Sequence, residues 1–178
     1  MKRILISILL LLFTLVLSYA QSISYFGKKA DLKPDHSYRI EEIVGGDTVI
    51  LKLKLGRRTF SKNVAFKLEQ SFLTKLQEID RNNKEVVKRN YLENTSEAVT
   101  LYFDHHHTEI YNDQFLIQGT VDVQSLLSRL HLTEATFYPD NAEAFAVFDY
   151  SFGRELTQYV LTITYNIKGE IVSFSMNS

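Results

Sequence analysis

The stretch EAFAVFDYSFGRELTQYVLTITYNIKGEIVSFSMNS (143–178) decides the fold. It is rich in β-branched and aromatic residues, and turn-forming residues interrupt it at 151–153 and 166–169. Together with a similar run just upstream, it predicts strands over residues 134–138, 143–150, 157–165 and 170–176. Short turns join these strands, so we expect an antiparallel meander. The run 144–148 is apolar at nearly every position, which indicates a central strand.

The period of two along the last two strands predicts which side chains share a face. In the third strand, the side chains expected to share one face are Tyr159, Leu161, Ile163 and Tyr165. In the last strand they are Val172, Phe174 and Met176.

Residues 38–55 predict a β-hairpin, because Gly45-Gly46-Asp47 separates two β-rich runs. Alternation in its second run predicts a buried face made of Val49, Leu51, Leu53 and Leu55.

Four helices are expected between the hairpin and the meander. The first begins with Ser61 as N-cap, and its apolar stripe consists of Ala65, Leu68, Phe72, Leu76 and Ile79. Asn82-Asn83 is expected to end it before a second helix over 84–92, and a third covers 96–110. Asp122 is the expected cap of the fourth helix, whose apolar residues are Leu126, Leu127 and Leu130. The fold class is therefore α+β: an N-terminal β-hairpin, central helices and a C-terminal antiparallel β-meander form one sheet with helices on one face.

The first twenty residues have the three parts of a secretory signal peptide. Lys2 and Arg3 precede an apolar run over 4–17, and Ser18-Tyr19-Ala20 places small residues before Gln21. We expect residues 1–20 to be removed, which leaves 21–178 as a single domain in the periplasm or outside the cell. The alternative is an uncleaved anchor, although the run is short for a permanent span. The absence of cysteine excludes disulfides, thiolate metal sites and a lipid-modified cysteine.

Charge and hydropathy limit the partners. The chain has 20 basic and 21 acidic residues, so removal of Lys2 and Arg3 leaves 18 against 21, a net charge near −3. Such a surface does not attract polyanions in general, so no nucleic acid is expected. No apolar run after the signal approaches membrane length, and the oligomeric state is left open.

The segment Asp104-His105-His106-His107-Thr108-Glu109 is a candidate metal site. On a helix, only His105 with Glu109, His106 with Glu109, or Asp104 with His107 could share a face. The predicted metal ligands are His105, His106 and Glu109. The alternative is one partly buried, hydrogen-bonded histidine beside two exposed ones, with His106 and Glu109 within or near the apolar arc of the helix. His36 and His131 could join a divalent metal only through the tertiary fold, and no cofactor is otherwise expected.

Asp149 is the second candidate, because an acid within an apolar strand needs a partner. It could act as a general acid or base with a shifted pKa, or it could accept amide hydrogens from the turn at 151–153. Four meander tyrosines are also suited to protein recognition, since each combines apolar area with a polar tip: Tyr138, Tyr150, Tyr159 and Tyr165. The predicted binding residues are Asp149, Tyr150, Tyr138 and Tyr159.

Several C-terminal motifs resemble those of an uncharacterised family of small bacterial proteins. They are Tyr138-Pro139-Asp140, Phe145, Phe148-Asp149-Tyr150, Ser151, Gly153, Glu155-Leu156-Thr157, Tyr159 and Leu161. Tyr25-Phe26-Gly27 and the histidine-containing helix also fit the family pattern. The resemblance implies no activity, since the family has none established, and its members usually lack a leader.

These observations favour a non-catalytic protein-binding module, such as an inhibitor or an immunity-type protein. The chain has no G-x-S-x-G elbow, P-loop or G-x-G-x-x-G motif after a strand. A metal-assisted hydrolase built on the histidine-rich helix and a structural envelope protein are the alternatives.

Overall fold

The computed structural model describes residues 21–33, 36–54, 62–110, 116–117, 120–121 and 123–178. The expected signal peptide, Leu55, and the expected caps Ser61 and Asp122 lie outside these residues.

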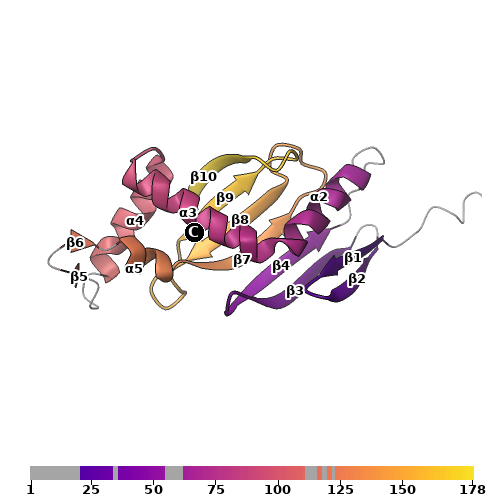
Figure 1. Ribbon diagram of the computed structural model, residues 1–178, viewed down its shortest axis with the longest axis horizontal. Helices are drawn as coiled ribbons and strands as arrows, with labels where there is room; N and C mark the ends of the chain where they lie inside the picture. Colours follow the sequence, from indigo (N-terminus) through magenta and orange to yellow (C-terminus); the bar gives the residue numbers. More distant parts are fainter. Residues whose placement is uncertain (1–20, 34–35, 55–61, 111–115, 118–119, 122) are drawn as a thin grey trace, which may run out of the picture.

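A six-stranded sheet forms the centre of the molecule (Figure 1). Its strands are β3 (Ser37–Val44), β4 (Asp47–Lys54), β7 (His131–Phe137), β8 (Ala146–Ser151), β9 (Val160–Tyr165) and β10 (Ile171–Asn177), in the order β10-β9-β8-β7-β4-β3. The meander β7 to β10 is antiparallel throughout. The hairpin β3–β4 joins it through a parallel pairing of β4 with β7. The predicted α+β fold is confirmed, and β8 lies inside the sheet as expected.

Two tight turns set the N-terminal hairpins. Gly45 and Gly46 join β3 to β4 with φ angles of +63° and +105°, which glycine adopts readily. A second hairpin, β1 (Gln21–Tyr25) with β2 (Lys28–Leu32), was not predicted. It packs beside helix α2, where the Gln70 side chain bonds to both backbone polar groups of Ser24.

The helices are α2 (Lys62–Thr74), α3 (Leu76–Leu92), α4 (Glu97–Ile110) and the short α5 (Val123–Ser128), and α2 and α3 cross one face of the sheet (Figure 1). Two short strands, β5 (Leu116–Ile117) and β6 (Thr120–Val121), pair between α4 and α5. The predicted break at Asn82-Asn83 was wrong, because the chain breaks at Lys75 and α3 runs through both asparagines. Asn83 stays helical because its buried side chain bonds to the sheet. No helix in the described ranges is long and apolar enough to cross a membrane.

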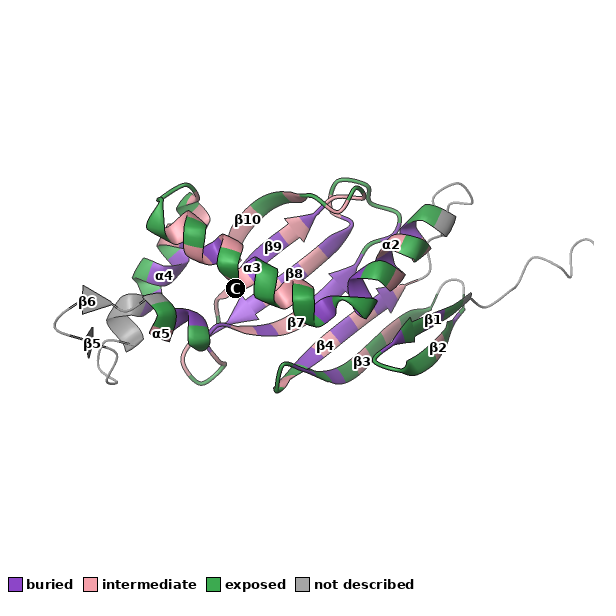
Figure 2. Cartoon of the chain, viewed as in Figure 1, coloured by how far each residue is buried: buried purple, intermediate pink, exposed green. Residues whose placement is uncertain are grey.

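The core lies between the helices and the sheet, as the buried stripes on the strands show (Figure 2). Phe72 of α2 lies at its centre, with ring-centroid distances of 5.2 to 6.3 Å to Phe137, Phe145, Phe148 and Tyr165. Burial of aromatic area of this kind is the largest favourable contribution to folding.

One face assignment in the meander was wrong. The pairing of β10 with β9 shifts its register between Ile171 and Ser173. Val172 is therefore the extra residue of a β-bulge, and its side chain is 50% exposed. Phe174 and Met176 pair with Ile163 and Leu161 and share their face, as predicted.

Candidate functional site

The face of the sheet opposite the helices is polar, and we call it the open face. The alternation that turns Phe148 and Tyr150 toward the helices turns Asp149 the other way. Strand pairing arranges the open face in two rows that cross all six strands. The acidic row contains Glu41, Ile50, Glu134, Asp149, Thr162 and Ser175. The basic row contains Arg39, Lys52, Thr136, Val147, Thr164 and Ser173.

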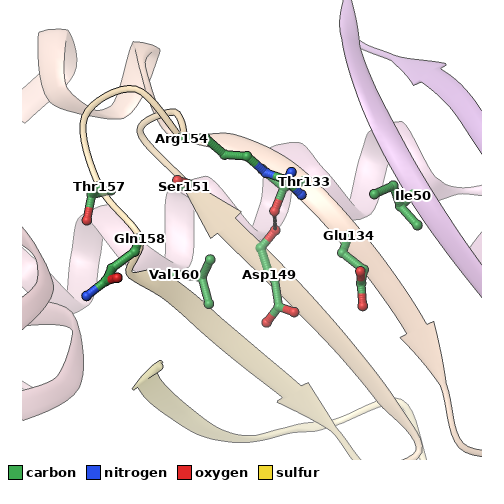
Figure 3. Close-up of a pocket in the computed structure, with 9 residues that line it drawn as sticks. All are labelled: Ile50, Thr133, Glu134, Asp149, Ser151, Arg154, Thr157, Gln158 and Val160. Carbon is green, nitrogen blue, oxygen red and sulfur yellow. Dashed lines mark hydrogen bonds between the residues drawn. The ribbon is translucent and has the colours of Figure 1, made fainter. Parts of the chain in front are cut away.

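A pocket of about 460 Å³ lies on this face beside the middle of the acidic row (Figure 3). Strands β4, β7, β8 and β9 and the loop between β8 and β9 supply its lining: Ile50, Thr133, Glu134, Asp149, Ser151, Arg154, Thr157, Gln158 and Val160. In Figure 3 the carboxylates of Glu134 and Asp149 point to the same side, and Arg154 lies at the other end of the pocket.

Asp149 is held by its neighbour strand and not by the turn, so the turn interpretation was wrong. Its Oδ1 accepts a hydrogen bond from Thr162 Oγ1 at 2.6 Å, and Thr162 Oγ1 accepts one from Asn177 Nδ2 at 2.9 Å. The turn uses Ser151, whose Oγ accepts from the Gly153 amide at 3.1 Å. Burial raises the pKa of Asp149, and the Glu134 carboxylate adds to the rise, whereas the Thr162 bond and Lys52 lower it.

Glu134 lies directly opposite Asp149 on β7. Like charges in this arrangement repel, and Lys52 offsets the repulsion. Its Nζ is 2.5 Å from Glu134 Oε1, which also accepts from Thr136 Oγ1 at 2.8 Å. The two carboxylates are thus held in fixed orientations before any ligand arrives.

The loop after β8 brings different chemistry to the pocket. Arg154 and Gln158 are exposed, and Arg154 forms no ion pair within the described part of the chain. Guanidinium, amide, hydroxyl and carboxylate groups therefore surround one hollow. It can donate and accept hydrogen bonds, and Asp149 can exchange a proton with a bound group.

The predicted tyrosines do not form one site. Tyr138 is 48% exposed beside the basic row, in a separate hollow with Lys52 and Lys54. Tyr150 is fully buried, where its hydroxyl accepts from Asn83 Nδ2 at 3.0 Å, so it offers no surface to a partner. Tyr159 is half-buried, and its ring centroid is 5.1 Å from that of His105.

His106 is a buried structural residue. A carbonyl oxygen only accepts, so His106 Nδ1 donates to the Tyr102 carbonyl at 2.6 Å, and Nε2 accepts from Thr157 Oγ1 at 2.7 Å. Thr157 Oγ1 in turn accepts from the Tyr159 amide at 3.0 Å. Both ring nitrogens are therefore engaged. The pattern agrees with the alternative of a hydrogen-bonded His106 beside an exposed His105.

The predicted metal set of His105, His106 and Glu109 lies partly outside the described residues. The side chain of Glu109 lies outside the described residues, as does that of His107. His131 Nδ1 is 2.8 Å from Asp47 Oδ2, and His36 lies beside the ring of Tyr38. Among the described side chains, no group of three or more His, Asp or Glu could hold a metal ion.

Sequence reasoning missed Glu134, Lys52 and Thr162 of the open face. An acid inside a β-rich run marks Glu134 as it marks Asp149, so the same argument would have found it. Lys52 and Thr162 give no such signal, because their roles depend on strand register. Comparisons with protein families, curated proteins and solved structures found no match for this chain. The resemblance of the C-terminal motifs therefore stays a prediction.

Proposed function

We propose that the protein is a non-catalytic binding module that recognises another protein through the open face of its sheet. The observation that carries this proposal is the division between the two faces. The described helices cover one face, whereas the other presents polar side chains already fixed by hydrogen bonds. Pre-ordered side chains lose little entropy on binding, which favours association.

The dimensions and composition of the open face suit a protein partner. Six strands about 4.8 Å apart, each about 20 Å long, make a flat area of roughly 500 Å². Each partner in a standard interface buries about 800 Å² of accessible surface. Accessible surface follows the contours of the side chains and is larger than the flat area beneath it, so the open face is large enough for such an interface. Ile50, Val147 and Val160 lie between the polar groups and are half-buried, so a partner could desolvate them further.

A photo-crosslinking experiment tests the proposal. A benzophenone amino acid replaces Val147 at the middle of the open face, and a matched variant carries it at Arg81, exposed on α3. In the producing cells we expect one discrete heavier adduct from position 147 and none of that mass from position 81. The purified adduct partner should bind the unmodified protein, and Thr162→Arg should weaken this binding at least about tenfold. Equal adducts from both positions, or none from position 147, would refute the proposal.

We also propose that the protein acts after export, because of the tripartite pattern over residues 1–20. N-terminal sequencing of the protein from the envelope and the medium should then begin at Gln21. Recovery of the chain in the cytoplasm with its first residues intact would contradict export.

A further inference from the structure

We propose that the partner presents an acidic, extended segment to one corner of the open face. This basic corner consists of Arg39, Lys52, Lys54 and Tyr138. The inference rests on the proposed protein-binding function and names the chemistry of the partner.

Strand pairing concentrates three cations in this corner. Arg39 on β3 lies directly opposite Lys52 on β4, and Lys54 follows two residues later on the same face of β4. A hollow of about 380 Å³ lies among them, with Thr136 and the exposed ring of Tyr138 in its lining.

The cations of this corner are only partly compensated in the free protein. Like charges directly opposite each other on neighbouring strands repel. Lys52 is neutralised by Glu134, but Arg39 and Lys54 form no ion pair with any residue that the structure describes. The full chain contains slightly more acidic than basic residues, so the cluster stands against the overall sign of the charge. Carboxylates from a partner would remove this repulsion, and the planar guanidinium of Arg39 could bind one of them in a bidentate manner.

The neighbouring acidic row selects the kind of anion. Glu41 on β3, Glu134 on β7 and Asp149 on β8 lie in the next row of the same sheet face. A continuous polyanion such as nucleic acid or a sulfated glycan would place charge over this row as well, where it is repelled. A short peptide with a few carboxylates avoids that repulsion. Its alternate side chains recur about every 7 Å, which matches the spacing of Lys52 and Lys54 along β4. Tyr138 supplies the apolar contact beside them.

Fluorescence anisotropy with defined peptides tests the inference. The probes are a labelled peptide of four Glu-Val repeats and its Lys-Val counterpart, titrated with the purified protein at about 50 mM salt, where screening is weak. We expect the acidic peptide to bind at least about tenfold more tightly than the basic one. The variant Arg39→Glu/Lys54→Glu should lose at least about tenfold in affinity.

A matched control separates position from net charge. Lys67→Glu/Arg81→Glu makes the same charge change on exposed positions of α2 and α3, and it should keep the affinity within about twofold. Circular dichroism shows whether each variant is folded, and Arg39→Gln replaces the double variant if that one is not.

Three results would overturn the inference: equal affinity for both peptides, equal loss in both double variants, or tighter binding of a sulfated oligosaccharide with the same dependence on Arg39 and Lys54. A persistent crosslink from position 147 alongside any of these would leave the protein-binding function intact. Absence of the crosslink from position 147 would by itself refute the proposed protein-binding function.

Discussion

We predict that Asn83→Ala lowers the free energy of unfolding by about 1 to 3 kcal/mol. Asn83 Nδ2 donates to the Tyr150 hydroxyl at 3.0 Å, and Oδ1 accepts from the Tyr165 hydroxyl. Asn83 and Tyr150 are completely buried and Tyr165 is 8% exposed. One side chain in the middle of α3 thus connects the helix to two neighbouring strands.

The magnitude follows from the two hydroxyls that the substitution would leave behind. A buried polar group without a partner costs about 1 to 3 kcal/mol. Tyr165 reaches the edge of the core and can bond to water, and the Tyr150 hydroxyl keeps the Asp80 carboxylate as a neighbour, so both costs lie toward the lower limit. The higher helix propensity of alanine offsets about 0.6 kcal/mol of this loss in the free energy of unfolding. A domain of this size is stable by about 5 to 15 kcal/mol, so the remaining loss is large.

Urea denaturation followed by circular dichroism measures the effect, and Asn82→Ala is the matched control. Asn82 is the exposed neighbour on the same helix, so its replacement gains the propensity and loses no buried bond. We expect a change within about 0.6 kcal/mol for the control. The triple variant Asn83→Leu/Tyr150→Phe/Tyr165→Phe should recover most of the loss, because the two hydroxyls that lose the Asn83 side chain are then absent. If Asn83→Ala and Asn82→Ala differ by less than about 0.5 kcal/mol, the reasoning is refuted.

Three further predictions concern the core and the sheet edge. Burial raises the pKa of Glu69 from 4.5 to about 8, so its ionisation opposes folding. Stability should therefore fall by roughly 1.4 kcal/mol per pH unit as pH rises through that range, and Glu69→Gln should flatten the profile of denaturation midpoint against pH. An equal slope in the variant would contradict this. Thr157→Val should cost about 1 to 3 kcal/mol in urea denaturation because it strands His106 Nε2, whereas Thr157→Ser should cost much less. Equal costs would assign the effect to packing. Val172→Ser should change stability by less than about 0.5 kcal/mol and Phe174→Ala by more than about 1, and the reverse order would place the bulge elsewhere.

Periodicity predicts those parts of this fold in which one face of an element is buried. The alternation of Val49, Leu51 and Leu53 gave the second strand of the hairpin, and all three are buried. The meander followed from the same signal, and the apolar run 144–148 correctly predicted that β8 lies inside the sheet. Val172 escaped this reasoning, because a bulge changes the face of a residue without changing the composition of the strand.

The error at Asn82-Asn83 has a different cause. Asparagine favours turns because its side chain competes for nearby backbone groups, so two in succession predict a break. That preference amounts to less than about 1 kcal/mol per residue, and the two buried bonds of Asn83 exceed it. Their partners are 67 and 82 residues away in the chain, so no local pattern contains them.

The candidate site shows the same limit at the level of function. An acid in an apolar strand identifies Asp149 as unusual, and that inference needs only its neighbours in sequence. Its role depends on Thr162 across one strand boundary and on Glu134 across the other. Glu134 in turn depends on Lys52, which reaches it through the parallel pairing of β4 with β7. A shift of one residue in that pairing would turn Lys52 and its row toward the core. The acidic and basic rows are therefore consequences of the register between distant strands, and so is the proposed preference for an acidic partner segment. The sequence alone identifies only the single residue Asp149 as unusual.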